Sequence, residues 1–170
     1  MRTTAQRRVS RRRLGFSLME LLIVVAILMI LGAVAIPRIN DALRNAKEMA
    51  AVREIHNLNQ AQVQYMSQYG RFATSLTELG PPTGGQAGPA GADFITGEMA
   101  KGLKNGYLFT VQGSQTGYTI NANPQSFPTT GRRTFYSDQT GVLRQNFGAE
   151  PANATSAELG GAAEATPQKK

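Results

Sequence analysis

The sequence predicts an α+β fold in which one long N-terminal helix packs on a small antiparallel sheet of three or four strands. Three patterns support this prediction. An apolar run occupies residues 16–36, an amphipathic pattern follows over residues 43–65, and two hairpin patterns fall between residues 107 and 147. The 170 residues suffice for one such domain but are few for two.

The first half of the predicted helix is apolar enough to lie in a membrane. Residues 16–36 read FSLMELLIVVAILMILGAVAI, with no charge from Leu21 to Ile36. A membrane span needs roughly 20 predominantly apolar residues, and the segment reaches that length only if it includes Glu20. Basic residues are dense just before it, so the positive-inside rule predicts a cytoplasmic N-terminus and an exported domain.

The charge distribution argues against nucleic-acid binding as the main function. The formal net charge is +7, but six of the 18 basic residues lie within residues 1–15. The remainder of the chain has 12 basic and 11 acidic residues, whereas a nucleic-acid interface needs its basic residues on the folded domain. The chain has no cysteine, which excludes a disulfide scaffold, a thiolate metal site and a cysteine nucleophile.

The second half of the helix is predicted from an amphipathic stripe. We expect Gly32 and Pro37 to end or kink the apolar half, because proline lacks a backbone donor and clashes with the preceding turn. Helical spacing then resumes, with Glu48 among the charged residues assigned to other faces. One helix from about Phe16 to about Tyr69, bent near Pro37 and capped by Gly70, accounts for the pattern. The stripe consists of Leu43, Ala46, Ala50, Ile55, Leu58, Ala61 and Tyr65.

The sheet is predicted from two hairpins. Residues 80–106 are rich in Gly and Pro and indicate a loop, with room for a short helix over residues 97–103. Strands over 107–112 and 117–122 flank GSQT, and strands over 133–137 and 142–147 flank DQTG. From Gly148 the composition predicts a disordered tail. The candidate core residues are Tyr107, Phe109, Tyr118, Ile120, Phe135, Val142 and Leu143.

The start of the apolar run carries a specific motif. Gly15-Phe16-Ser17-Leu18-Met19-Glu20, after a short basic leader and before the apolar helix, resembles the processing motif of type IV prepilins and type II secretion pseudopilins. The strong resemblance covers residues 8–72 and thins beyond them to a general domain plan. Many relatives have Tyr-Pro near the end of the helix, where this chain has Phe72-Ala73.

The resemblance implies a pilin-like processing and assembly pathway. A prepilin peptidase would cut between Gly15 and Phe16 and methylate the new Phe16 amine. The precursor would sit in the inner membrane, in contact with its lipid, with the domain in the periplasm. An assembly platform with a motor ATPase would then extract the subunit into a homopolymeric filament. The resemblance divides the chain into a leader (1–15), a membrane and filament-core segment (16–36), the helix and sheet domain (37–147) and a tail (148–170).

Glu20 is the candidate assembly residue. A lone carboxylate in hydrocarbon must be neutralised or paired, and no Lys or Arg lies within helical reach on the apolar side. The resemblance implies that the Phe16 amine of one subunit meets Glu20 of a neighbour and sets the axial register, as single buried polar groups do in coiled coils. The alternative is that Glu20 extends to the membrane interface and has no assembly role.

Several alternatives remain open from the sequence. The filament could be a type II secretion pseudopilus or a surface type IV pilus, and the chain could be its major or a minor subunit. From a different class, a secreted periplasmic binding domain with a cleaved signal peptide fits the basic start, the apolar run and the A-x-A-like Ala33-Val34-Ala35.

Signals for enzymatic chemistry are not found in the sequence. His56 is the one histidine, and it falls in the amphipathic helix, where a half-exposed structural residue is expected. No G-x-S-x-G, P-loop or H-E-x-x-H pattern occurs. Asp138 is the one acidic residue between Lys101 and Phe147, so a calcium site there lacks ligands. We expect no enzyme activity, cofactor or metal, and we expect Arg132 and Arg133 to be a solvated pair in a loop.

Overall fold

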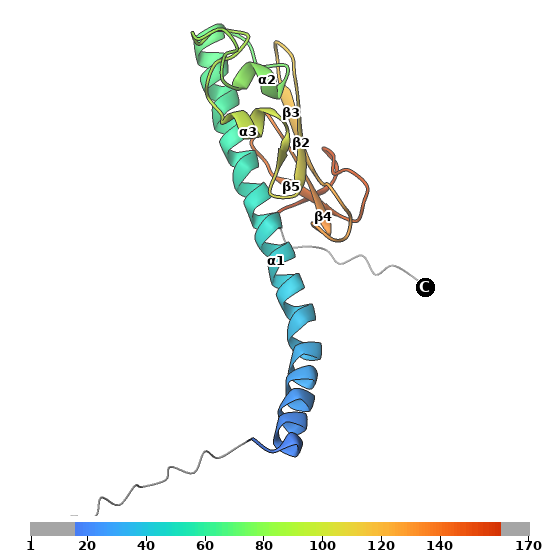
Figure 1. Cartoon of the computed structure of the whole chain (residues 1–170). Helices are drawn as coiled ribbons and strands as arrows, with labels where there is room; N and C mark the ends of the chain where they lie inside the picture. The colour runs from blue at the N-terminus through green and yellow to red at the C-terminus, as the bar shows by residue number, and fades with distance from the viewer. Residues whose placement is uncertain (1–15, 161–170) are drawn as a thin grey trace, which may run out of the picture. The chain divides into compact units, whose positions relative to one another are not determined.

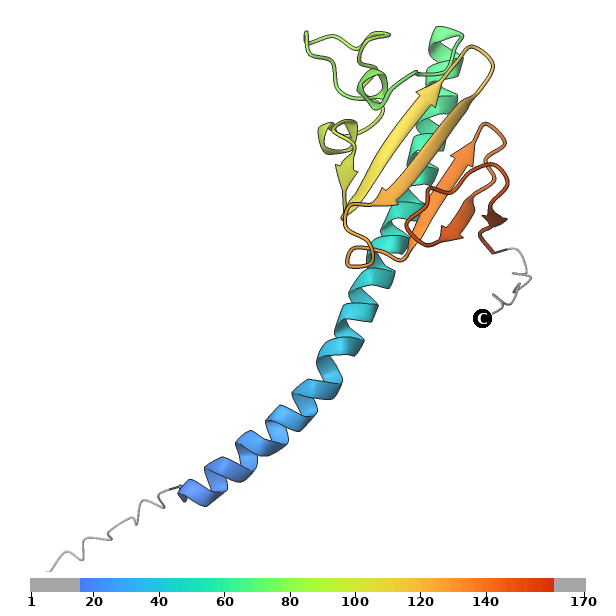
Figure 2. The same cartoon turned by 90° about the vertical axis from the view of Figure 1, so that its right-hand side faces the viewer.

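The structure is a computed structural model that describes residues 16–160, except for the side chains of Val34 and Pro37. The α+β prediction is confirmed: a long helix is followed by two short helices and an antiparallel sheet (Figures 1 and 2). The described residues divide after Asn40 into two compact units, residues 16–40 and 41–160, which are treated separately below. The elements are α1 (Leu18–Tyr69), α2 (Leu76–Leu79), α3 (Gly97–Ala100), β1 (Leu103–Lys104), β2 (Tyr107–Gly113), β3 (Tyr118–Pro124), β4 (Arg133–Asp138), β5 (Arg144–Phe147) and β6 (Ala157–Glu158).

Helix α1 is one element of 52 residues, and both of its ends agree with the sequence prediction. Its C-terminus is closed by Gly70, which has φ +70° and donates its N–H to the Met66 carbonyl at 2.9 Å. Glycine is suited to this left-handed position because it has no Cβ to clash with the preceding turn.

The sheet has six strands among the described residues, rather than the predicted three or four. Its order is β1-β2-β3-β4-β5-β6, and every neighbouring pair is antiparallel. The two predicted hairpins correspond to β2–β3 and β4–β5. The additional strands β1 and β6 have two residues each, which is too short for any alternation of apolar and polar residues to reveal them.

The core of the second unit lies between one face of the sheet and the later turns of α1. Helix residues Ile55, Leu58, Ala61 and Tyr65 are buried there, as the predicted stripe requires. The earlier stripe residues Leu43 and Ala46 are exposed, so the stripe prediction is wrong at its N-terminal end. Val142 is half-buried, and the other candidate core residues of the sheet are buried. Figure 2 shows the strands side by side over this part of α1.

The segment after α1 folds back on the helix. Leu76 and Leu79 of α2 are buried, and Phe72 packs against the core. The fully buried Gln62 fixes the start of this segment: its Nε2 donates to the Ala73 carbonyl at 3.0 Å, and its Oε1 accepts from the Ala73 N–H at 2.9 Å. Both polar ends of a buried amide are thereby satisfied, which such burial requires.

The prediction of a disordered tail from Gly148 is wrong for residues 148–160. Asn121 Nδ2 donates to the Ala152 carbonyl at 2.9 Å, and Thr134 Oγ1 donates to the Glu150 carbonyl at 2.8 Å. Ala152 is buried, and β6 pairs with β5 (Figure 2). Polar side chains on the sheet thus bind the backbone of a segment whose own composition offers little apolar surface. The remaining part of the predicted tail, residues 161–170, lies outside the described residues.

Candidate functional site

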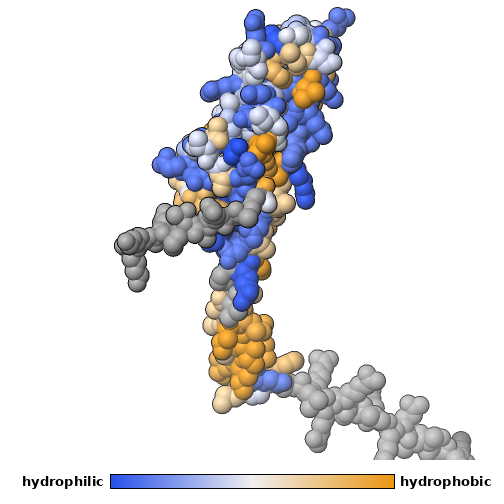
Figure 3. Space-filling model, turned by 180° about the vertical axis from the view of Figure 1, so that it is seen from behind, coloured by the Kyte–Doolittle hydropathy of each residue, from blue (hydrophilic) through white to orange (hydrophobic). Residues whose placement is uncertain are grey.

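The helical segment from Phe16 to Asn40 exposes nearly all of its apolar side chains. Phe16 is 84% exposed, and Gly32 is half-buried. On the face shown in Figure 3, hydrophobic residues gather over the lower part of α1, whereas polar residues dominate the surface of the second unit. A patch this large is not stable in water and marks a membrane or protein interface. The exposed large apolar residues are Phe16, Leu18, Met19, Leu21, Leu22, Ile23, Val24, Val25, Ile27, Leu28, Met29, Ile30, Leu31, Ile36 and Ile39.

By length and composition, α1 could cross a membrane, and it is the one such helix among residues 16–160. None of the residues in its most apolar 18-residue stretch is buried inside the protein. This observation separates it from the core helix of a water-soluble domain, which would satisfy the same length test with its apolar residues covered. An N-terminal signal sequence would also be long and apolar enough to cross a membrane and would also be exposed. The helix alone therefore does not define the class of protein.

Glu20 lies in the first turn of α1, exposed among apolar neighbours. A carboxylate at this end of a helix is favoured by the positive pole of the helix dipole. Arg38 is the one basic residue between Phe16 and Asn40, and at about 1.5 Å per residue along the helix it lies roughly 27 Å from Glu20. Arg38 therefore cannot neutralise Glu20, which leaves the carboxylate available for a cation outside this segment.

The other site residues predicted from the sequence are Gly15, Phe16, Gly32 and Pro37. Gly15 lies outside the described residues. Phe16 is described, two residues before the start of α1. The helix is assigned without a break through Gly32 and Pro37, so neither residue ends it. The kink near these residues stays a prediction, and so do the cleavage after Gly15 and the assembly role of Glu20.

A charged cluster that the sequence analysis missed lies where α1 meets β4. Glu48 is only 3% exposed, and its two carboxylate oxygens accept from the Arg132 backbone N–H and from Arg133 Nε, each at 2.7 Å. Arg133 also donates from Nη1 to Gln145 Oε1 at 2.9 Å. Buried carboxylates need such partners, because removing a charge from water is costly unless it is paired and hydrogen-bonded.

Two expectations about this cluster were therefore wrong. Arg133 belongs to β4 and is bound to Glu48, so it is not half of a solvated pair in a loop, although Arg132 is mostly exposed and reaches Asp41 at 3.4 Å. Glu48 faces the sheet instead of an exposed side of the helix. The periodicity could have revealed this, because Glu48 precedes Val52 by four residues and Ile55 by seven, both of them buried.

Tyr107 lies beside this cluster, and its ionisation should make the stability of the fold depend on pH in the alkaline range. Burial raises the pKa of the Tyr107 phenol, and the negative charge of Glu48 raises the pKa further. Above about pH 10 the unfolded chain ionises this phenol while the folded chain does not, so the folded state loses stability as pH rises. We expect the free energy of unfolding to fall above pH 10 and to fall less steeply in Tyr107→Phe.

Urea unfolding of the full chain in detergent at several pH values would measure this effect. At neutral pH the variant should lose about 1 kcal/mol, because the hydroxyl donates to the Arg133 carbonyl at 2.9 Å. An identical alkaline slope in both proteins would assign the pH dependence to other groups. Tyr118 and Tyr136, for which burial also raises the pKa, are the next to test.

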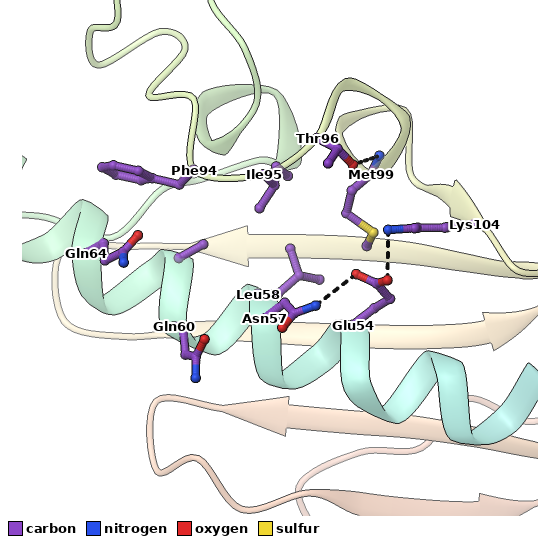
Figure 4. Close-up of a pocket in the computed structure, with 11 residues that line it drawn as sticks. Glu54, Asn57, Leu58, Gln60, Gln64, Phe94, Ile95, Thr96, Met99 and Lys104 are labelled. Atoms are coloured by element: carbon purple, nitrogen blue, oxygen red, sulfur yellow. Dashed lines mark hydrogen bonds and ion pairs between the residues drawn. The ribbon is translucent and has the colours of Figure 1, made fainter.

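A pocket of about 250 Å³ lies between α1 and the segment that leads through α3 to β1 (Figure 4). Leu58, Ile95 and Met99 form apolar walls, and the two charged lining residues, Glu54 and Lys104, are paired at 2.8 Å. Its volume is below the usual range of ligand sites, roughly 300–1,000 Å³. The lining holds no nucleophile beside a base, so the pocket offers no arrangement for catalysis.

Metal-binding and acid–base groups are sparse in the described part of the chain. Within residues 16–160, no group of three or more His, Cys, Asp or Glu side chains is placed to hold a metal ion. His56 is exposed on α1. The exposed apolar segment with its single carboxylate, Glu20, is accordingly the feature that most needs a functional explanation.

Comparison with known proteins points to the same N-terminal segment as the functional part of the chain. Residues 10–36 match the family described as the prokaryotic N-terminal methylation motif. The chain is also similar to the type IV major pilin protein PilA of Myxococcus xanthus (strain DK1622), with 40% identity over 76 residues. That match covers 43% of this chain and 34% of the relative, so the chain spans about a third of the relative's length. Both matches support a type IV pilin or pseudopilin family for this chain.

Proposed function

We propose that this chain is a structural subunit of a type IV pilus-like filament, held in the inner membrane before it is assembled through the first half of α1. The observation that carries the proposal is the row of exposed large apolar side chains between Phe16 and Ile39. In the membrane, lipid would cover this surface. In a filament, the same segments of neighbouring copies would cover one another.

We further propose that maturation requires cleavage between Gly15 and Phe16 by a prepilin peptidase, with methylation of the new Phe16 amine. The match of residues 10–36 to the N-terminal methylation motif supports this step. The freed amine would supply the cation that Glu20 lacks within its own apolar segment. An inner-membrane assembly platform and a motor ATPase would then move the subunit from the lipid into the filament.

A surface pilus is favoured over a secretion pseudopilus. The relative is named a type IV major pilin, and 40% identity over 76 residues supports the same kind of subunit. On this proposal the precursor has a cytoplasmic N-terminus and a periplasmic domain, and the filament extends from the cell. Pilins are structural proteins, so we expect no catalytic activity.

Mass spectrometry of the mature protein tests the proposal at its first step. We expect the N-terminus at Phe16, carrying one methyl group. Deletion of the prepilin peptidase gene should leave the leader attached and abolish filaments. A mature N-terminus at Ile36 would instead support the secreted binding domain, because it places cleavage after Ala33-Val34-Ala35. An unprocessed start at Met1 in the wild type would contradict both readings.

A further inference from the structure

One end of the second unit combines exposed aromatic residues with basic ones. This basal face is formed by the first two turns of α1 in that unit, the β3–β4 connection and the end of β5. Phe147 is 72% exposed and Phe127 is 46% exposed. Neither residue belongs to the buried core. Phe and Arg are both enriched at interfaces relative to the rest of a protein surface, so their combination here favours an interaction surface. The basal face comprises Asp41, Arg44, Lys47, Phe127, Arg132 and Phe147.

Short contacts hold these segments together at one end of the sheet. Arg132 reaches Asp41 at 3.4 Å, and the Arg132 carbonyl accepts from the Gly148 N–H at 3.1 Å, next to Phe147. The Arg133 guanidinium lies 5.8 Å from the centre of the Phe147 ring. The connection that carries Phe127 is closed by the Thr130 N–H, which donates to the Ser126 carbonyl at 2.8 Å.

The charges at this end favour an anionic partner. The one carboxylate of the basal face, Asp41, is already paired with Arg44 and Arg132. The neighbouring buried Glu48 is bound to Arg133. The basal face, the neighbouring Glu48–Arg133 pair and the exposed Glu150 nearby together hold four cations and three carboxylates. Long basic side chains can keep their charge at a lipid headgroup while their stems cover apolar atoms. The four cations are Arg44, Lys47, Arg132 and Arg133.

Chain connectivity places this face near the end of the apolar segment. Asp41 follows Ile36 by five residues, which is about 8 Å along a helix and no more than roughly 18 Å for any chain path. If residues 16–36 span the membrane, the basal face therefore lies within reach of the bilayer surface. Interfacial segments that bind membranes combine Phe or Leu with Lys and Arg, as this face does.

We infer that the basal face binds the surface of an anionic lipid bilayer while the subunit waits in the membrane for assembly. Phe127 and Phe147 insert at the headgroup level, and Arg132 and Lys47 contact lipid phosphates. The inference rests on the proposed membrane anchoring of residues 16–36. A basic side chain near an anionic surface contributes about a fivefold change in partitioning, so a few such residues suffice to orient an already anchored domain.

Single labelled cysteines can test the contact, because the natural chain has no cysteine. Thr129→Cys places a fluorophore on the exposed connection beside Phe127, and Gln115→Cys places one in the exposed β2–β3 turn, at the opposite end of β3. The full chain is reconstituted in vesicles of phosphatidylglycerol and phosphatidylcholine that contain a lipid with a nitroxide on its headgroup. We expect severalfold stronger quenching at position 129 than at position 115, decreasing in pure phosphatidylcholine.

Matched variants then identify the residues responsible. Phe127→Ser combined with Phe147→Ser should reduce quenching at position 129 to the level of position 115. Val63→Ser removes an equally exposed apolar side chain 22 residues beyond Asp41 on α1 and should change nothing. Arg132→Gln should reduce quenching in phosphatidylglycerol and leave the weak quenching in phosphatidylcholine unchanged, which provides a second variant should the double one fold poorly.

The outcomes separate this inference from the proposed function. Vesicle flotation that carries the protein, together with equal quenching at positions 115 and 129, would overturn the lipid contact and leave the anchoring intact. Failure to float would overturn the anchoring and with it this inference. Quenching that does not depend on phosphatidylglycerol would also overturn the lipid contact. Quenching that appears only at a high protein-to-lipid ratio would overturn it as well, because the basal face would then bind a second copy of the chain.

Discussion

Replacing Glu20 with Ala should leave the subunit in the membrane and abolish filaments. The substitution makes residues 16–36 uniformly apolar, so insertion becomes no harder. It also removes the proposed partner of the Phe16 amine, which would then be buried unpaired in the filament core. Losing one partner of a buried pair costs about 3–5 kcal/mol, which weakens each subunit contact by a factor of roughly 100 or more.

The measurement is the filament fraction sheared from cells, compared with the subunit that stays in the membrane. Glu20→Gln is the matched control for shape, because it removes the charge alone and should also fail to assemble. Glu20→Asp keeps the charge on a shorter side chain and should assemble in part. Wild-type filament yield from Glu20→Ala would remove the assembly role and favour a carboxylate that simply reaches the membrane surface.

Replacing Glu48 with Ala should strongly destabilise the second unit. The change leaves the Arg132 N–H and the Arg133 guanidinium without the carboxylate that binds both at 2.7 Å. Arg133 retains Gln145, so the low end of the usual cost applies, about 3 kcal/mol. For a chain of this size that corresponds to a fall of roughly 10 °C in Tm.

Thermal unfolding of the full chain in detergent, followed by near-ultraviolet circular dichroism of its tyrosines, would measure this. Glu54→Ala is the matched control on the same helix, because its pair with Lys104 is partly exposed and should contribute about 1 kcal/mol or less. Glu48→Leu combined with Arg133→Met should recover part of the loss, since no buried charge is then left unpaired. Equal costs for Glu48→Ala and Glu54→Ala would show that the cluster is not a special contact.

The sequence by itself determined the fold class, the length of α1 and the two central hairpins. These depend on local signals: helical and alternating periodicity, Gly70 at the helix end, and turn residues between short strands. The segment from Phe16 to Glu20 was also fixed by sequence, because its motif is read in consecutive residues. The structure then showed that the side chains of this segment are exposed, which explains why the segment needs a partner.

Only the tertiary structure decided where burial begins along α1, which groups bind Glu48 and the order of residues 148–160. Leu43 and Glu48 show why: the sheet covers Glu48 but not Leu43, and hydrophobicity alone predicts the reverse. Arg133 comes 85 residues after Glu48, and Asn121 comes 31 residues before Ala152. Hydrogen bonds over such separations form only after the sheet has brought their partners together, so no local pattern of residues encodes them.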